Sequence, residues 1–325
     1  MNLVVTIDTE GDNQWDHGRG VTVENMKYVP RFQELCEKYD IKPTYLVTSE
    51  ICDDNFSREF LGVLNISGRA EIGCHLHSWT TPPFEEKPGF RYNDKNHSYA
   101  SELPPGLLKS KLKNLTDQIK VSFGKNPTSF RSGRYGFNDE VARELVKNGY
   151  LVDSSVTPYT SWKSHPGLAD GNGGPDFIDK GPFPYYFNYQ EGTLLEIPVT
   201  ILPTRYPLNK YSSVAEFYFR NVDTSFILRA FRKAFFRNQP MWLRPYVWMT
   251  NNILNEVVDE ALKLKLPYIV MMFHSSELMP GCSIYRPDIH SIEVLYNLLG
   301  SFFKDMQDRK VESVTLTEAA INYKR

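Results

Sequence analysis

The sequence lacks the features that define several classes of protein. Its four cysteines are isolated and form no Cys-x-x-Cys pair, which argues against a zinc finger or thioredoxin-type motif and fits a reducing compartment. No run approaches the roughly 18 consecutive apolar residues that span a bilayer. The net charge of -2 argues against a general nucleic-acid-binding protein, which is usually strongly basic.

The N-terminal stretch MNLVVTIDTEGD also lacks the pattern of a secretory signal. Its apolar run is short, has no basic leader and meets an acid at Asp8. We therefore expect a cytoplasmic protein. No linker or shift in composition divides the 325 residues, so we expect one domain over residues 1–325 and make no prediction of its oligomeric state.

Strand-like and helix-like patterns alternate along most of the chain. Short apolar runs with the character of buried parallel strands lie at residues 2–8, 43–48, 70–75, 128–131, 150–153, 194–199, 267–273 and 311–316. Apolar residues at helical spacing lie at residues 28–39, 49–66, 106–122, 138–148, 249–265 and 288–309, and a short helix is expected at the C-terminus. This alternation predicts an α/β fold, with about eight strands in a barrel or an incomplete barrel and helices outside.

Two segments interrupt the alternation. Residues 155–191 are turn-rich and aromatic, and a loop this long is often functional. A helical insertion is expected at about 212–237. It overlaps the stretch FILRAFRKAFFRN, residues 226–238, in which basic residues interleave with phenylalanines. That pattern is typical either of a helix at a membrane surface, giving weak association, or of an ordinary helix that packs its Phe face on the barrel.

Polar residues capable of acid–base, metal or anion-binding chemistry follow the expected strands where each one ends. These residues are Asp8 and Glu10, His75 and His77, Arg131, Asp153 and His274. Taken singly, each fits a solvated loop end. Because the carboxyl ends of parallel strands gather on one face of such a fold, we expect Asp8, Glu10, His75, Arg131 and His274 to converge in one pocket.

The spacing of two of these pairs indicates a metal site. Residues i and i+2 of an extended segment point the same way, so Asp8 with Glu10, and His75 with His77, form two pairs that each face one side. Two imidazoles with a carboxylate are a typical zinc-binding set. The sequence therefore predicts a divalent metal, most readily zinc, held by Glu10, His75 and His77.

The same stretches, in this order, resemble the motifs of the polysaccharide deacetylase superfamily (carbohydrate esterase family 4). The segments that carry the resemblance, between residue 3 and about residue 277, are TIDTEGD, EIGCHLHSW, SFRSGRYG, YLVDSS and IVMMFHSSE. The resemblance implies an incomplete (β/α) barrel of about seven parallel strands. It also implies a hydrolase that uses a metal ion to remove an acetyl group from a sugar.

Roles for individual residues follow from the resemblance. Asp8 would be the base that takes the proton of water, and Arg131 would hold its carboxylate. A backbone amide near Tyr135 would stabilise the oxyanion. His274 would protonate the leaving group, with Asp153 setting its charge. Arg134, Arg244 and Glu277 are further polar candidates, for which the resemblance gives no role.

Two departures from the family pattern concern the metal. Many members have two adjacent acids in the first motif, whereas Thr9 separates Asp8 from Glu10 here. The family's two histidines usually lie four residues apart, but Trp79 occupies the position four after His75. Either His77 replaces the missing ligand, or His97 does, or the site is two-ligand or metal-free, as in some relatives.

Three functions remain open from the sequence. The first is a deacetylase acting on an N- or O-linked acetyl group of a sugar, which for a cytoplasmic protein predicts a nucleotide-linked or lipid-linked precursor of a surface polysaccharide. The second is a metal-free amide (C–N) hydrolase of the same fold. The third is a sugar-binding protein without catalytic activity.

Overall fold

The computed structural model describes residues 1–12, 20–84, 98–168, 171, 173–204, 208–210, 212–222, 225–228, 230 and 240–324. His97, the alternative ligand, lies outside the described residues, as do residues 229 and 231–238 of the basic and aromatic stretch.

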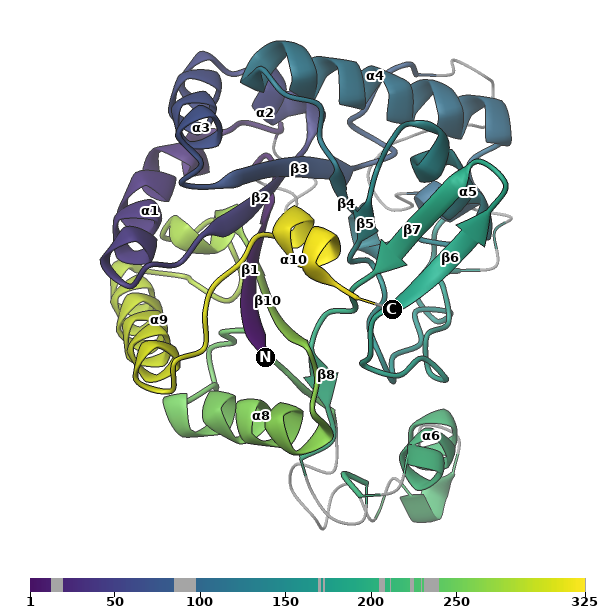
Figure 1. Cartoon of the computed structure of the whole chain (residues 1–325), viewed down its shortest axis with the longest axis vertical. Helices are drawn as coiled ribbons and strands as arrows, with labels where there is room; N and C mark the ends of the chain where they lie inside the picture. Colours follow the sequence, from purple (N-terminus) through teal and green to yellow (C-terminus); the bar gives the residue numbers. More distant parts are fainter. Residues whose placement is uncertain are drawn as a thin grey trace.

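One curled sheet organises the chain, with strand order β10-β1-β2-β3-β4-β5-β7-β6 (Figure 1). Its strands are β1 (Asn2–Thr9), β2 (Pro43–Val47), β3 (Glu71–Leu76), β4 (Ser129–Ser132), β5 (Val152–Asp153), β6 (Tyr185–Tyr189), β7 (Gly192–Glu196) and β10 (Tyr268–His274). Neighbouring strands are parallel throughout except for the antiparallel pair β6 and β7. Strands β10 and β6 form the two open edges of the sheet, so the expected incomplete barrel of about seven parallel strands in a single domain is confirmed.

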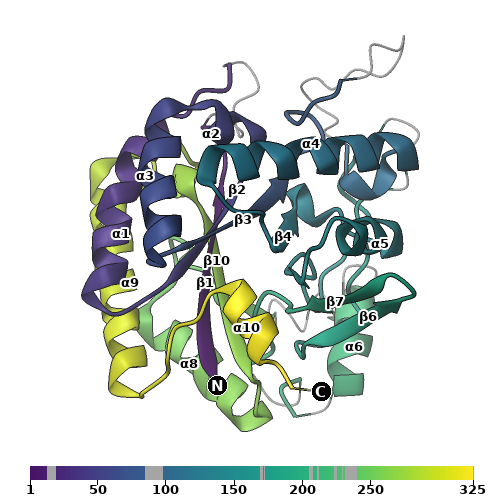
Figure 2. The same ribbon diagram turned by 45° about the horizontal axis from the view of Figure 1, so that its top comes forward.

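Helices cover the outside of the sheet (Figures 1 and 2). They are α1 (Val29–Lys38), α2 (Ser49–Asp53), α3 (Asn55–Ser67), α4 (Pro105–Phe123), α5 (Asp139–Lys147), α8 (Asn251–Leu264) and α9 (Ile289–Asp308). Helices α1 and α9 lie side by side, joined by a Tyr39–Phe303 ring contact and an exposed Arg31–Glu293 ion pair. The remaining pieces are α6 (Ser212–Asn221), α10 (Leu316–Asn322), the short pair β8 (Ile201–Leu202) and β9 (Met241–Trp242), and the 3₁₀ turns η1 (Glu24–Tyr28), η2 (Ala100–Glu102), η3 (Gly133–Tyr135) and η4 (Ser275–Leu278).

The alternation of side chains along β1 shows how the barrel is filled. Leu3, Val5 and Ile7 belong to the large core between sheet and helices, whereas Val4 belongs to a second cluster with Val270. That second cluster includes Leu316 and Ala319 of α10, which packs against β1 and β5. Since alternate residues share a face, Thr6 and Asp8 follow Val4 on the inner side, above an apolar floor. The barrel is therefore closed by α10 at one end and carries polar groups toward the other.

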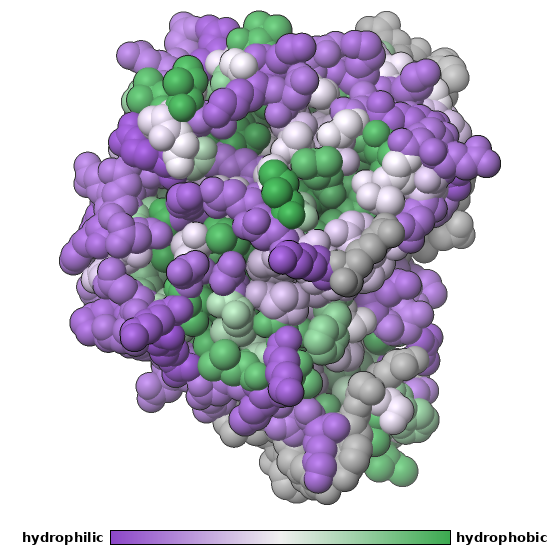
Figure 3. Space-filling view, in the orientation of Figure 1, coloured by the Kyte–Doolittle hydropathy of each residue, from purple (hydrophilic) through white to green (hydrophobic). Residues whose placement is uncertain are grey.

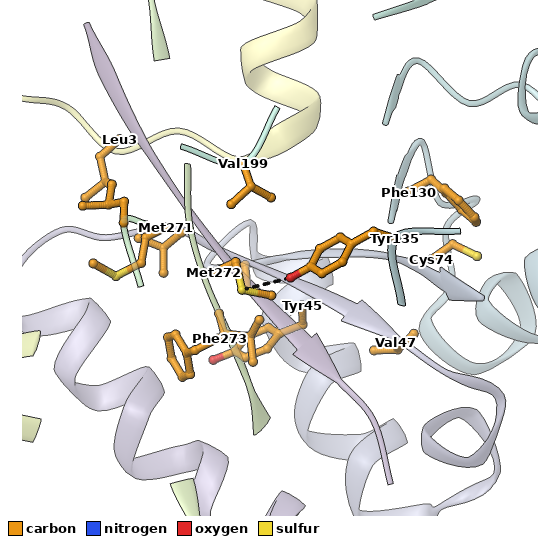
Figure 4. Packing of buried hydrophobic residues seen from close by; sticks show 14 of the residues in the cluster. Leu3, Tyr45, Val47, Cys74, Phe130, Tyr135, Val199, Met271, Met272 and Phe273 are labelled. Atoms are coloured by element: carbon orange, nitrogen blue, oxygen red, sulfur yellow. Dashed lines mark hydrogen bonds between the residues drawn. The ribbon is translucent and has the colours of Figure 1, made fainter. Parts of the chain in front are cut away.

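Aromatic and sulfur-containing side chains pack closely inside the main core. Figure 4 shows Tyr135 pointing at Met272 of β10, and its hydroxyl donates a hydrogen bond to the Met272 sulfur at 3.5 Å. The outer surface around α10 is mainly hydrophilic, with hydrophobic residues in patches between (Figure 3). Among the described helices, none combines the length and the apolar character that crossing a bilayer requires.

Two expectations about individual elements are wrong. Residues 49–66 form two helices rather than one, because extended Asp54 separates α2 from α3 and caps α3 by accepting a hydrogen bond from Ser57 N. Residues 311–316 contribute only an isolated bridge between Ser313 and Leu3. Thr315 and Glu318 form a capping box there, and this local interaction begins α10 in place of a strand.

The two segments that interrupt the alternation differ in structure. The described residues of the segment 155–191 are mostly in turns and loops, and β6 lies near its end. In the segment 212–237, α6 accounts for Ser212–Asn221, and much of the remainder lies outside the described residues.

Candidate active site

A cavity of about 520 Å³ opens at the carboxyl ends of the parallel strands. Its lining combines acids and imidazoles from strand ends with aromatic side chains and arginines from the connecting segments. The lining residues are Asp8, Glu10, His75, His77, Trp79, Tyr99, Ser132, Arg134, Tyr135, Trp162, His165, Trp242, Arg244, Tyr246, His274 and Tyr285. Asp8, Glu10, His75 and His274 thus meet in one cavity, with Arg131 hydrogen-bonded to Asp8 beside it.

Asp8 is anchored by Arg131, which reaches it from β4 across the inside of the barrel. Arg131 is fully buried and donates hydrogen bonds to Asp8 Oδ1 at 2.6 Å, to Thr6 Oγ1 at 2.9 Å and to the Ser154 carbonyl at 2.7 Å. Burial alone would raise the pKa of Asp8, but the Arg131 guanidinium and two nearby imidazoles hold it well below its usual range. Asp8 is therefore ionised at neutral pH.

Glu10, His75 and His77 form a compact cluster beside Asp8. One ligand atom from each of the three lies within 4.8 Å of the others, and all three side chains are buried. The shortest contact joins His77 Nε2 to Glu10 Oε2 at 3.1 Å, while His75 Nε2 lies 4.0 Å from Glu10 Oε2. Burial raises the pKa of Glu10 and lowers the pKa of each imidazole to about 4, so both histidines are neutral at pH 7.

The surroundings of the two imidazole rings are compatible with a metal ion. His75 Nδ1 lies 2.9 Å from the Arg131 carbonyl, and donation to that oxygen leaves the Nε2 lone pair directed at the cluster. His77 Nδ1 is buried and has no hydrogen-bond partner among the described residues, so contacts within the protein do not fix the tautomer of this ring. Two neutral imidazoles and a carboxylate are a common zinc donor set that leaves a further position open.

His77 is also held from the side. Its ring stacks on Trp79 with centroids 4.2 Å apart and planes 24° from parallel. A Cβ added at Gly133 would meet His77 Cδ2 at 2.5 Å and the Leu76 carbonyl at 2.8 Å, so only glycine fits there. Trp79, which lies four residues after His75, thus positions the imidazole of His77, although Trp79 cannot itself bind a metal.

The turn after Gly133 is strained. Arg134 and Tyr135 both adopt left-handed backbone conformations, with φ of 53° and 60°. Such conformations cost about 1–3 kcal/mol each in residues other than glycine and cluster at functional sites. They occur where a backbone amide near Tyr135 is expected to face the reacting group.

His274 contacts a carboxylate that differs from the expected one. Its Nδ1 lies 3.3 Å from Glu277 Oε1 and 3.1 Å from Arg244 Nη2, while its Nε2 lies 3.9 Å from Asp8 Oδ2. Burial would lower the pKa of His274, but the Glu10 carboxylate and the hydrogen bond to Glu277 raise it overall. These contacts keep the ring protonated to a higher pH than an exposed imidazole.

Asp153 is not among the described residues that line the cavity. Its carboxylate accepts hydrogen bonds from Ser155 N at 3.0 Å and Ser155 Oγ at 2.7 Å, and Ser155 Oγ in turn accepts one from Ser132 N at 2.9 Å. Asp153 is paired in the sheet with Glu196 of β7, and both are fully buried. Glu277 is the carboxylate that contacts His274, whereas the contacts of Asp153 are with Ser155 and the neighbouring strand. The role of Asp153 in setting the charge of His274 stays a prediction.

Aromatic side chains form much of the cavity wall. Tyr135 stacks on Trp162 with centroids 5.3 Å apart, and Trp162 meets Trp242 edge-on at 6.4 Å.

Sequence reasoning gave no role to Glu196, Trp162 or Trp242 and left Arg244 and Glu277 without one. The only available signal was position: Glu277 lies three residues after His274, and Trp162 lies in the aromatic segment 155–191.

Comparisons with known proteins identify the fold. No family model and no curated protein matches the sequence. A structure assigned to a polysaccharide deacetylase of Mycobacterium smegmatis is 13% identical, with a TM-score of 0.54 over 98% of this chain and 89% of that one. Puue allantoinase is 13% identical, with a TM-score of 0.52 over 98% and 88%. A 4-alpha-glucanotransferase of Thermococcus litoralis is 14% identical, with a TM-score of 0.55 over 99% of this chain but 40% of that one. The chain therefore shares its fold with these structures, which include one assigned to a polysaccharide deacetylase.

Proposed function

We propose that this protein is a metal-dependent hydrolase that removes an N- or O-linked acetyl group from a sugar. The observation that carries the proposal is the buried Glu10–His75–His77 cluster, beside which Asp8 Oδ2 lies 3.9 Å from Nε2 of both His75 and His274. A deacetylase needs a base for water and an acid for the leaving group on either side of one acetyl carbon. Asp8 and His274 line the same cavity as the cluster, and we propose them for these two roles.

Glu10, His75 and His77 would hold the ion, and zinc suits two imidazoles and a carboxylate best. When bound, a divalent ion polarises an acetyl carbonyl and lowers the pKa of a water molecule. His75 is prepared for this role because its Nδ1 is already engaged by the Arg131 carbonyl.

The remaining steps belong to side chains and backbone. Asp8, kept ionised by Arg131, accepts a proton from the attacking water on Oδ2, because Oδ1 is occupied by Arg131. The backbone amide near Tyr135 stabilises the negative charge that develops on the acetyl oxygen. His274 then donates the proton on Nε2 to the departing nitrogen or oxygen of the sugar. Acetate and the deacetylated sugar are the products.

We further propose a small sugar precursor, nucleotide-linked or lipid-linked, as the substrate, with the reaction taking place in the cytoplasm. All four cysteines lie outside disulfides, which supports a reducing compartment. The insertion at 155–191 contributes Trp162 and His165 to the cavity, so we propose that it selects the sugar.

The proposal is tested by measuring acetate release from a panel of acetylated sugars and sugar nucleotides by the protein loaded with one zinc per chain. Activity that is lost with a chelator and restored by zinc supports it. A second candidate, a metal-free amide hydrolase, is favoured by the fold likeness to an allantoinase. Release of product from a small C–N substrate by chelated protein would establish that candidate and exclude the first.

A further inference from the structure

We propose that Arg244 and Glu277 form a positioning pair that fixes the ring of His274, whose charge the superfamily resemblance had assigned to Asp153. This inference rests on the proposed function for its consequence in turnover, but its structural part stands on the contacts of the three side chains. The pair serves to keep Nε2 of His274 directed at the reacting group in both charge states of the imidazole.

Glu277 binds His274 at two points. Turn η4 begins directly after His274 and brings the carboxylate three residues on back toward it. Glu277 Oε1 accepts from the His274 backbone N at 3.1 Å and lies 3.3 Å from the ring Nδ1. Contacts to both the backbone and the ring restrict rotation of the side chain, so the direction of Nε2 is set by the turn.

Arg244 completes the arrangement from a different part of the chain. Its Nη2 donates to Glu277 Oε1 at 2.7 Å and lies 3.1 Å from His274 Nδ1. The guanidinium also lies over the rings of Tyr246 at 4.8 Å and Tyr285 at 5.3 Å, which limits its movement. Arg244 and Glu277 are both buried, so the ion pair is shielded from solvent and salt.

Glu277 keeps the proton on Nδ1 in both charge states. The imidazolium, and the neutral ring that remains after Nε2 has released its proton, both donate from Nδ1 to Glu277 Oε1, which Arg244 Nη2 holds in place. A ring flip would remove Nδ1 from both partners and place a carbon between them. The flipped ring is therefore disfavoured whether or not His274 has released its proton, and Nε2 is the atom that faces Asp8 Oδ2.

The activity test compares Glu277→Gln, Glu277→Ala and Glu277→Asp in the zinc-loaded protein. Loss of the carboxylate should lower kcat about 10- to 100-fold, in the range of other supporting groups behind a functional histidine. KM should change less than about threefold, because Glu277 is not among the described residues that line the cavity. Glu277→Asp, which keeps the charge, should recover part of kcat. Glu260→Gln removes a buried carboxylate of α8, which has no part in the site, and should leave kcat unchanged.

A second measurement is independent of substrate. In protein labelled with ¹⁵N-histidine, His274 is identified by the signals lost in His274→Gln. At a pH where its ring is neutral, the two nitrogens should have well-separated shifts, as one tautomer gives. In Glu277→Ala the shifts should move together, as a mixture of tautomers gives. Circular dichroism and zinc content of each variant establish that it is folded.

The results separate the two proposals. Wild-type activity with unchanged kcat in Glu277→Gln and Glu277→Ala would overturn the positioning role and leave the deacetylase proposal intact. A wild-type protein without activity on any acetylated sugar would overturn the proposed function. The ¹⁵N shifts of His274 alone would then decide whether Arg244 and Glu277 position its ring. Shifts that are already averaged in the wild type, or unaltered in Glu277→Ala, would overturn the positioning pair.

Discussion

Asp8 and Arg131 form a buried ion pair in which only one oxygen of the carboxylate contacts the guanidinium. Oδ1 lies 2.6 Å from Arg131 Nη1, whereas Oδ2 lies 3.9 Å from Nε2 of both His75 and His274. Three more donor–acceptor contacts hold the guanidinium, so the carboxylate cannot turn without breaking a fixed arrangement. The free oxygen is thereby aimed between the metal-binding cluster and the third imidazole.

The first prediction is that Asp8→Asn abolishes turnover but retains zinc. A general base contributes about 10²–10⁴-fold, and asparagine cannot accept the proton of water. Removing the charge also leaves Arg131 buried without its counter-ion, which should lower the free energy of unfolding by about 3 kcal/mol. Acetate release and zinc content are measured on the same preparation. Loss of zinc along with activity would make Asp8 a metal ligand. It would contradict the assignment of Asp8 as the base and Glu10 as the ligand.

The second prediction is that His75→Ala and His77→Ala each lose zinc. Zn–N bonds of about 2.0–2.1 Å require both rings to reach one point, which the compact cluster permits. His165→Ala is the matched control, because His165 lines the same cavity but stands apart from the cluster. Zinc content is measured by mass spectrometry of metals after dialysis. Full occupancy in His77→Ala would reassign His77 to substrate binding and make another residue, with His97 the first choice, the missing ligand.

Much of the fold and the main site residues could be predicted from the sequence. Parallel strands have continuous apolar runs, and their carboxyl ends must share one edge, so polar residues after Ile7, Cys74, Phe130 and Phe273 had to meet. The inference needed only the strand ends and no knowledge of side-chain direction. It therefore tolerated errors of one or two residues in the strands.

Other features could not be predicted, because they depend on how turns place side chains. Glu277 reaches His274 only because η4 turns back on itself, and no periodicity signals that turn. Asp153 lies at its strand end as expected, but it pairs in the sheet with Phe130 and Glu196 and is not among the described residues that line the cavity. At residues 311–316, β-branched side chains favoured a strand, while the capping interaction of Thr315 with Glu318 decided the outcome.

The third prediction concerns the aromatic wall. Trp162→Ala should raise KM about 10-fold and change kcat less than about threefold, because a wall that contacts the sugar binds substrate and transition state alike. Trp248→Ala is the control, since Trp248 is half exposed and is not among the described lining residues. Initial rates are measured over a range of substrate concentrations. A fall in kcat without a change in KM would place Trp162 in support of the turn at Tyr135 instead.

The fourth prediction concerns the buried carboxyl pair of Asp153 and Glu196. Burial and the charge of Asp153 raise the pKa of Glu196 well above its usual value. Glu196 Oε2 has no donor among the described residues, and a proton on Glu196 that is donated to Asp153 satisfies both groups. The folded protein should therefore keep one proton on this pair at a pH where the unfolded chain has released it.

The sign of the effect on stability follows from that proton. Below about pH 4.5 both states are protonated, so Glu196 does not make stability depend on pH. Above about pH 4.5 the folded state binds more protons than the unfolded chain. The free energy of unfolding of the wild type should therefore fall by up to about 1.4 kcal/mol per pH unit, until Glu196 in the folded protein ionises. Glu196→Gln keeps a donor for Asp153 and removes this slope, so its advantage over the wild type should grow from pH 4.5 to pH 7.5. Urea unfolding at several pH values measures both slopes, with Glu144→Gln as the control for loss of a buried carboxylate elsewhere. Parallel curves for wild type and Glu196→Gln would show that the pair holds no shared proton.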